Sequence, residues 1–344
     1  MASKKKLSVG VIGLGMGKLH AEAVKEFGAK LSGLCDPNPE KLETARTELK
    51  VPKKNCFSDY RDMLANTALD VVIIASPDML HREQVHACLE KGLHVMCEKP
   101  LALNHEDMAA IIEDVKAHPE CKFMIGQICR FTPAFVKAKE IVDAGMIGEL
   151  YFVESEYAHN YQKMFEADAN NWRSNPERNG VVGGGCHAVD LLRWIVGSDP
   201  YEVFGYGTHK VLPQVSYDDA NIALMKFPNN VMGKVFVSTG CKRNYTMRTV
   251  LYGTNGTLIF DNKSPTMQLF MPNEDGSGSS TPREIEVTLA DHNAKAEFAA
   301  FGNAILNDEE IAMNVYEGAK TVAACIAIVE STKTGKPTAP NYNF

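Results

Sequence analysis

A glycine-rich turn near the start of the chain has the residue types and spacing of a phosphate-binding site. It follows the apolar run 7–12 and precedes a segment with helical spacing near 18–27. Gly13 permits a tight turn and Gly15 lets the backbone approach a pyrophosphate, whose charge a helix N-terminus attracts. Lys18 stands where G-x-G-x-x-G has its third glycine, so a merely structural turn is the alternative. The predicted dinucleotide-binding turn comprises Gly13, Leu14, Gly15, Met16 and Gly17.

An acidic residue follows this turn at the distance that a dinucleotide site requires. Asp36 ends the second apolar run, 31–35, about 20 residues further along the chain. A carboxylate in this position accepts hydrogen bonds from the adenosine ribose and repels the 2′-phosphate of NADP, so we expect NAD. The segment Asp36-Pro37-Asn38 also resembles a turn that starts a helix, and both interpretations can hold together.

Two more junctions between apolar runs and helical segments carry polar residues. Ser76-Pro77 and His81 follow the run 70–75, and Glu98-Lys99-Pro100 follows the run 94–97. The carboxyl ends of parallel strands are where an open α/β sheet binds its ligand. Burial beside an apolar strand lowers the pKa of a lysine, which suits Lys99 to chemistry. A surface pair between Lys99 and Glu98 is the alternative.

The second half of the chain contains one further candidate for acid–base chemistry. His187 follows the glycine-rich segment 180–185, and Asp190, three residues later on the same face of a predicted helix, is expected to orient its ring. Histidine titrates near neutrality and is a common general base, although a buried structural histidine is the alternative. No histidine pair has the i, i+4 spacing of a zinc-binding helix, and we predict no metal site.

The elements that position these residues divide the chain into two predicted domains. Short apolar runs alternate with helical segments through residues 1–128, which indicates a doubly wound α/β domain with a parallel sheet. Residues 129–344 begin with a helix and continue with alternating strands between 149 and 260, separated by turn signals. Helical segments near 293–306 and 313–331 close the chain. We predict a second α/β domain with a large, mostly antiparallel open sheet.

Composition excludes several classes of function. The chain has 344 residues with 36 Lys and Arg against 43 Asp and Glu, and the net charge of −7 argues against nucleic-acid binding. No stretch approaches the ~20 apolar residues of a membrane span, and no signal peptide is evident. The nine cysteines are scattered without a CxxC pair, which suits a reducing compartment. We therefore expect a cytoplasmic protein.

Together these motifs resemble the Gfo/Idh/MocA oxidoreductase family over nearly the whole chain, from about residue 9 to 331. The resemblance implies an N-terminal Rossmann domain and a C-terminal α/β domain whose open sheet carries the substrate and often the oligomer contact. It also implies oxidation of a sugar, cyclitol or polyol hydroxyl with NAD or NADP. The matching motifs are Gly13-x-Gly15 with His20, Ser76-Pro77 to His81, Glu98-Lys99-Pro100, Arg130-Phe131-x-Pro133, Trp172-Arg173 and His187-x-x-Asp190.

The resemblance also implies roles for individual residues. Lys99 would lie between nicotinamide and substrate, and His187 would be the acid–base residue. Family members commonly carry an aspartate four residues before that histidine, where this chain has Gly183. The implied cofactor-binding residues beyond the glycine turn are Asp36, Ser76, Pro77, His81, Glu98, Lys99 and Gln127. The implied substrate-binding residues are Arg130, Tyr157, His159, Trp172, Arg173, His187 and Asp190.

Three functions remain open at this point. The first is a dehydrogenase in which His187 takes the hydroxyl proton and Lys99 stabilises the developing alkoxide. The second is a redox-neutral enzyme that holds NAD tightly and cleaves or rearranges glycosides through transient oxidation, which the glycine at 183 favours. The third is a non-catalytic NAD or sugar sensor, which has no need of a proton-transfer pair. We also expect a homodimer or homotetramer formed through the sheet of the second domain.

Overall fold

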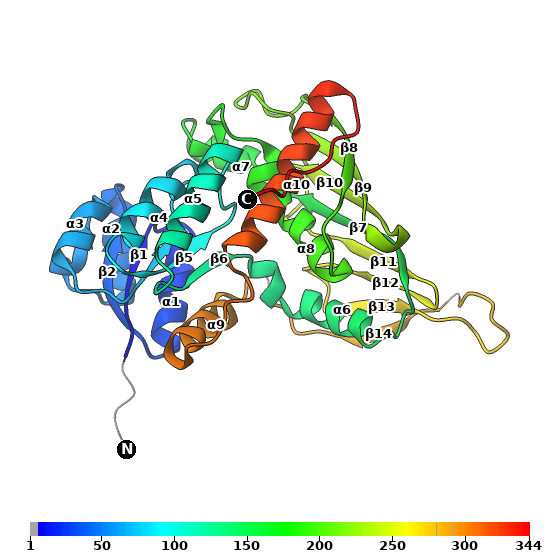
Figure 1. The fold of residues 1–344 in the computed structure, drawn as a ribbon, viewed down its shortest axis with the longest axis horizontal. Helices are drawn as coiled ribbons and strands as arrows, with labels where there is room; N and C mark the ends of the chain where they lie inside the picture. The colour runs from blue at the N-terminus through cyan, green and yellow to red at the C-terminus, as the bar shows by residue number, and fades with distance from the viewer. Residues whose placement is uncertain (1–5, 280, 291) are drawn as a thin grey trace, which may run out of the picture. The chain divides into compact units, whose positions relative to one another are not determined.

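The structure is a computed structural model that describes residues 6–279, 281–290 and 292–344 (Figure 1). The described residues form two compact units. The first unit contains residues 6–128, 293–319 and Phe344, and the second contains the described residues of 129–292 and 320–343. No helix in the described part of the chain is long and apolar enough to cross a membrane.

A six-stranded parallel sheet forms the centre of the first unit, with the order β3-β2-β1-β4-β5-β6. The chain builds one half of the sheet outward from β1 and then returns to build the other half from β4. The carboxyl ends of β1 and β4 therefore flank the point where the strand order reverses, which is where such sheets bind ligands. The strands are β1 (Ser8–Ile12), β2 (Lys30–Cys35), β3 (Cys56–Phe57), β4 (Val71–Ile74), β5 (His94–Glu98) and β6 (Phe123–Gly126).

Helices alternate with these strands, as the sequence predicted. The β4 and β6 runs are apolar throughout because both faces of the sheet are covered, and both strands are fully buried. The side chain of Asn38 accepts hydrogen bonds from two backbone N–H groups and caps the second helix. The helices are α1 (Gly17–Glu26), α2 (Pro39–Leu49), α3 (Tyr60–Asn66), α4 (His81–Leu89) and α5 (His105–Ala117).

One later helix also belongs to the first unit. The segment 293–319 contains α9 (Ala294–Asn307), which packs along α1. Phe27 and Phe298 make an edge-to-face contact there, with ring centroids 5.5 Å apart. The expected domain boundary after residue 128 stays a prediction, and the contacts of α9 add this segment to the first unit.

An eight-stranded sheet forms the second unit, with the order β14-β13-β12-β11-β7-β10-β9-β8. Among the described strands of this sheet only the neighbours β7 and β10 are parallel, so the prediction of a mostly antiparallel sheet is confirmed. The sequence between the last two strands is rich in polar residues. The strands are β7 (Leu150–Ala158), β8 (Glu202–Thr208), β9 (Ala220–Lys226), β10 (Met232–Ser238), β11 (Thr249–Gly253), β12 (Gly256–Phe260), β13 (Thr266–Phe270) and β14 (Arg283–Glu286).

Helices cover one face of this sheet. The helix that follows the glycine-rich segment, α8, packs on β7 and β10, and α6 packs against α8. The strand β9 alternates buried and exposed residues, because its inner face meets this layer and its outer face is open. The helices in or entering this unit are α6 (Pro133–Asp143), α7 (Gln162–Ala167), α8 (Cys186–Val196) and α10 (Val315–Thr334).

Candidate active site

The glycine turn of the first unit has the geometry of a phosphate-binding turn. Gly13 has φ +83°, and a Cβ there would lie 2.5 Å from the carbonyl oxygen of Ala75, so the position requires glycine. A Cβ at Gly15 would meet nothing within 4 Å, so this exposed backbone is open to approach. A Cβ at Gly17 would lie 2.8 Å from Val11, which shows that the third glycine permits close packing of α1 on β1.

Asp36 connects the end of β2 to this turn. Its Oδ2 accepts a hydrogen bond from the backbone N–H of Leu14 at 2.7 Å, and its Oδ1 accepts one from Asn38 at 2.9 Å. Each carboxylate oxygen retains further capacity to accept. Lys18, the cation nearest to the glycine turn in sequence, forms an ion pair with Glu48 on α2. The turn and the carboxylate together fit a dinucleotide.

The loops after β4 and β5 are linked through a buried histidine. Ser76 and Pro77 precede α4, and His81 at its start places Nδ1 2.8 Å from the carbonyl oxygen of Pro100. Burial lowers the pKa of His81, so the neutral ring donates this hydrogen bond. At the end of β6, Gln127 is 1% exposed and its Oε1 has no hydrogen-bond partner among the residues that the structure describes. A buried amide of this kind suits a ligand contact.

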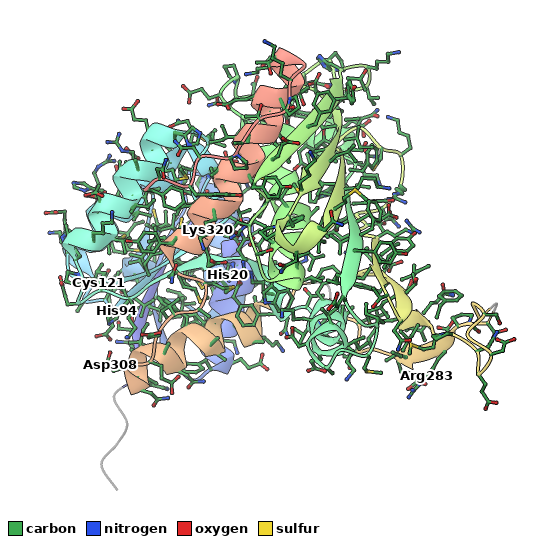
Figure 2. The ribbon with its side chains drawn as sticks, turned by 45° about the vertical axis from the view of Figure 1, so that its right-hand side comes forward. His20, His94, Cys121, Arg283, Asp308 and Lys320 are labelled. Atoms are coloured by element: carbon green, nitrogen blue, oxygen red, sulfur yellow. The ribbon has the colours of Figure 1, made fainter. Side chains whose placement is uncertain are left out.

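Lys99 follows a buried pair at the end of β5. His20 on α1 is fully buried, with Nε2 2.7 Å from Oε1 of Glu98, and Figure 2 labels it. The other oxygen of Glu98 accepts a hydrogen bond from the backbone N–H of Lys99 at 3.2 Å. Burial opposes ionisation of Glu98, but the hydrogen bond from His20 and nearby positive charge outweigh it, so the pKa lies below its ordinary value. The pair of His20 and Glu98 therefore links the backbone of Lys99 to α1, the helix that follows the glycine turn.

A second carboxyl group, which sequence reasoning missed, lies close to this pair. Glu297 on α9 is 0% exposed, and neither of its oxygens has a hydrogen-bond partner within the described residues. Burial and the negative charge of Glu98 raise the pKa of Glu297 well above its ordinary value. The surroundings of Glu297 therefore favour its neutral acid form over the carboxylate.

In the second unit, the glycine-rich segment lets three side chains touch the backbone. Residues 181–185 form a π-helical turn that leads into α8. A Cβ at Gly183 would overlap the guanidinium of Arg178, and one at Gly184 would lie 2.5 Å from the ring of Tyr157. A Cβ at Gly185 would lie 2.5 Å from Val237 on β10. The glycines are thus required by packing around the start of the helix that carries His187.

His187 is positioned by a thiol and an aromatic ring. Its Nδ1 lies 3.4 Å from Sγ of Cys129, and its ring stacks on Tyr157 with centroids 6.0 Å apart. The sequence predicted that Asp190 would orient this ring. The structure instead engages both oxygens of Asp190 with Arg130, at 2.7 and 2.9 Å, and one of them also with Thr321. Asp190 is 0% exposed, and Arg130 forms an ion pair with this buried carboxylate.

Tyr157 connects His187 to a set of polar rings. Its hydroxyl lies 3.0 Å from Nδ1 of His159 and 3.1 Å from the hydroxyl of Tyr161. Burial raises the pKa of Tyr157 well above its ordinary value, so the phenol keeps its proton and can donate a hydrogen bond. The predicted substrate residues Tyr157 and His159 are thereby brought together with His187.

The predicted residues Trp172 and Arg173 lie beside the same rings. The guanidinium of Arg173 is 4.3 Å from the ring centroid of Trp172 and 5.5 Å from that of Tyr161. Arg178 approaches both rings as well, at 4.8 and 6.0 Å. Sequence reasoning missed Cys129 and Arg178 as members of this cluster. The placement of Arg178 follows from Gly183, whose missing side chain leaves room for a guanidinium.

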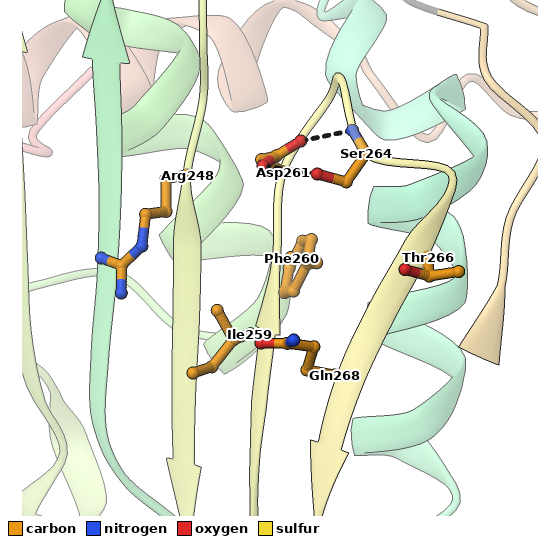
Figure 3. A pocket seen from close by; sticks show the side chains of 7 residues that line it. All are labelled: Arg248, Ile259, Phe260, Asp261, Ser264, Thr266 and Gln268. Carbon is orange, nitrogen blue, oxygen red and sulfur yellow. Dashed lines mark hydrogen bonds between the residues drawn. The ribbon is translucent and has the colours of Figure 1, made fainter. Parts of the chain in front are cut away.

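A surface pocket lies elsewhere on the second unit (Figure 3). Asp261 at its edge accepts hydrogen bonds from the backbone N–H and the hydroxyl of Ser264, so its carboxylate stabilises its own turn. None of the predicted site residues lines this pocket. Its lining residues are Arg248, Ile259, Phe260, Asp261, Ser264, Thr266 and Gln268.

Comparison with known proteins identifies the family. A model of the Gfo/Idh/MocA oxidoreductases with an NAD-binding Rossmann fold matches residues 7–127, and a model of their C-terminal domain matches residues 135–259. This chain belongs to the Gfo/Idh/MocA oxidoreductase family. It is therefore an NAD-binding oxidoreductase, and the predicted resemblance is confirmed.

Several relatives resemble the chain over most of its length. It is 28% identical over 285 residues to myo-inositol 2-dehydrogenase of Thermotoga maritima, which covers 79% of this chain and 80% of that protein. It is 28% identical over 294 residues to levoglucosan dehydrogenase of Pseudarthrobacter phenanthrenivorans, covering 74% and 73%. The structure of scyllo-inositol dehydrogenase from Lactobacillus casei with bound NAD(H) and scyllo-inositol matches with a TM-score of 0.79 and 26% identity, covering 97% and 99%.

Proposed function

We propose that this Gfo/Idh/MocA oxidoreductase oxidises a hydroxyl carbon of a sugar, glycoside or cyclitol. The observation that carries the proposal is His187, a histidine held by Cys129 and stacked on Tyr157 at the start of α8. The names of the relatives support the substrate class, because they act on inositols and levoglucosan.

In the proposed mechanism, two side chains manage the proton of the substrate hydroxyl. NAD supplies a hydride acceptor when it is bound. His187 takes the hydroxyl proton as general base, a role worth ~10²–10⁴-fold in rate. Lys99 donates a hydrogen bond to the same oxygen and stabilises the charge that develops on it. The bond from Lys99 N–H to Glu98 supports this role, because it fixes the backbone from which the lysine extends.

We further propose that NAD is preferred over NADP. Asp36 places a carboxylate beside the glycine turn, and the ion pair with Glu48 engages Lys18, which could otherwise attract a 2′-phosphate. Comparison of kcat/KM for the two cofactors tests this preference. Wild-type protein should have the higher kcat/KM with NAD. Asp36→Ala should reduce this preference, because the variant loses a hydrogen-bond acceptor for the ribose of NAD and no longer repels the 2′-phosphate of NADP. A wild-type preference for NADP would place Asp36 outside the ribose site.

The proposed activity is tested by NADH formation across a panel of sugars, cyclitols and glycosides. His187→Ala and Lys99→Ala should each lose at least ~10²-fold in turnover. Both variants should still bind NAD, because neither side chain belongs to the glycine turn. Turnover of His187→Ala near the wild-type value would show that another residue is the base.

A further inference from the structure

Two arginines share one pair of aromatic rings in the second unit. The guanidinium groups of Arg173 and Arg178 lie 4.3 and 4.8 Å from the ring centroid of Trp172. They also lie 5.5 and 6.0 Å from the centroid of Tyr161. Cation–π contacts hold each group in place, but two positive charges gathered on the same rings repel one another. An anion between or beside them would relieve that repulsion.

Arg178 places a positive charge where the family resemblance leads to the expectation of a negative one, near His187. The family resemblance leads to the expectation of an aspartate at residue 183, about one helical turn before the histidine. The structure has glycine there, and a Cβ at Gly183 would overlap the guanidinium of Arg178. Arg178 is 3% exposed, similar to His187 at 4%. The guanidinium of Arg178, a cation with hydrogen-bond donors, therefore occupies the space that the side chain of an aspartate at residue 183 would enter.

The arginines and His187 belong to one continuous cluster. Tyr161, which both arginines approach, places its hydroxyl 3.1 Å from that of Tyr157. Tyr157 in turn stacks on His187, with centroids 6.0 Å apart. A group bound at the arginines is therefore two aromatic side chains away from the proposed base.

Arg173 retains donor capacity for a ligand. Its side chain donates one hydrogen bond, to Oδ1 of Asn171 at 3.3 Å, and its buried Nε has no partner within the described residues. It forms no ion pair with any carboxylate that the structure describes. A guanidinium presents donors in a planar fork that matches a carboxylate, and such charge-assisted pairs are stronger than neutral hydrogen bonds.

We infer that Arg173 and Arg178 bind the carboxylate of an acidic sugar, so that the substrate is a uronic acid or a glycoside of one. This inference rests on the proposed function and adds the charge of the substrate to it. The carboxylate would lie at the arginines, while a ring hydroxyl of the same molecule lies at His187. Neutral cyclitols and sugars lack the group that this subsite recognises.

Matched pairs of sugars test the inference. D-Glucuronate against D-glucose, and methyl β-D-glucuronide against methyl β-D-glucoside, share a ring and differ in the carboxylate. We expect kcat/KM to be roughly ten- to hundredfold higher for the acidic member of a pair, in line with charge-assisted hydrogen bonds. Arg173→Met and Arg178→Met should each remove most of that ratio. Arg243→Met, which alters an arginine paired with Glu156 on the sheet, is the control and should leave the ratio unchanged.

Binding is measured separately from turnover. The chain has two tryptophans, so a Trp194→Phe background lets the fluorescence of Trp172 report ligand binding to the NAD-loaded protein. Tighter binding of the acids without NADH formation would contradict the proposed dehydrogenase and leave this inference standing. Equal or better binding and oxidation of the neutral sugars would overturn the inference and leave the proposed function standing.

The arginine variants also test the assignment of the subsite. A preference for acidic sugars that persists in both variants would place the carboxylate elsewhere and overturn the assignment. Because Arg178 is buried, its loss could disturb the fold, so NAD affinity is measured alongside. The half-buried Arg173 provides the second variant, and loss of the acid preference in Arg173→Met with unchanged NAD affinity supports the inference on its own.

Discussion

Glu297 is the residue whose local environment most clearly opposes its ionised form. It is fully buried in α9, its oxygens have no hydrogen-bond partner among the described residues, and Glu98 contributes a nearby negative charge. Its pKa in the folded protein is therefore well above the ordinary value of 4.5 that applies to an unfolded chain. Above pH 4.5 the unfolded state releases this proton first, so folding stability falls as pH rises until the folded group also ionises.

Glu297→Gln should abolish this pH dependence, because glutamine has a similar shape and does not titrate. The stability of the variant relative to wild type should increase between pH 5 and pH 8, by at most ~1.4 kcal/mol per pH unit. Urea unfolding at both pH values measures it. Glu310→Gln, an exposed change beyond the end of α9, is the control and should alter stability by less than ~0.5 kcal/mol at either pH. A relative stability of Glu297→Gln that is the same at both pH values would show that Glu297 is not buried as a neutral acid.

At this scale, sequence reasoning found residue types but not all of their partners. Lys99 and His187 stood out because each follows a strand or a glycine-rich segment that places it at a ligand-binding edge. Arg130 was indicated by the family resemblance and Asp190 by its place on the helix face of His187, yet they pair with one another across 60 positions of sequence. Such a pairing depends on the tertiary fold, and no local spacing indicates it.

At the scale of elements, the glycines before and after α1 have different roles. Gly15 faces open space, so its lack of a side chain serves the approach of a ligand. Gly28, after α1, has φ +85°, and a Cβ there would also meet nothing within 4 Å, so this glycine serves backbone conformation alone. The two glycines therefore make a matched pair for mutation.

Gly15→Ala should keep its stability but lose at least ~10-fold in NAD affinity, because the new methyl group would occupy the approach to the backbone. Gly28→Ala should lose ~1 kcal/mol of stability through strain at positive φ and keep its NAD affinity. Thermal unfolding without NAD and a fluorescence titration with NAD measure the two effects. Unchanged NAD affinity in Gly15→Ala would mean that the dinucleotide does not cross this turn.

Most elements could be predicted because their patterns are strong. Continuous apolar runs alternating with helices indicated the parallel sheet, and alternation with turn signals indicated most of the antiparallel one. The strands β3, β13 and β14 and the short helices α3 and α7 were missed. β14 is short and polar at the sheet edge, with three of its four residues exposed, so it has no apolar pattern to detect. The packing of α9 on α1 was missed because it joins segments about 270 residues apart.

At the scale of the whole molecule, the outer face of the large sheet is the most apolar exposed surface described. Tyr206 on β8, Leu224 on β9 and Met232 on β10 are 64%, 54% and 55% exposed. Ile222 and Tyr151 extend this surface along neighbouring strands, at 40% and 49%. Apolar surface of this kind on a sheet marks a site of association. We propose that it joins copies of this chain into a homodimer or homotetramer.

Leu224→Arg should convert the oligomer to a monomer, because an arginine at the centre of this face would be buried without a partner. Light scattering should give two or four chain masses for wild type and one for the variant. Leu289→Arg, at a residue 56% exposed outside the sheet, is the control and should leave the mass unchanged. A monomeric wild type at micromolar concentration would contradict the interface.

The central claim is net oxidation of a carbohydrate hydroxyl with Lys99 and His187 handling its proton. A single-turnover reaction tests this claim most directly. NAD-loaded protein is mixed in excess with each member of a panel of sugars, cyclitols, uronates and glycosides. We predict one NADH for each oxidised product from at least one substrate, formed at least ~10²-fold more slowly by His187→Ala and by Lys99→Ala loaded with the same NAD. A glycoside that is cleaved or rearranged without NADH formation would contradict the claim and establish a redox-neutral reaction instead.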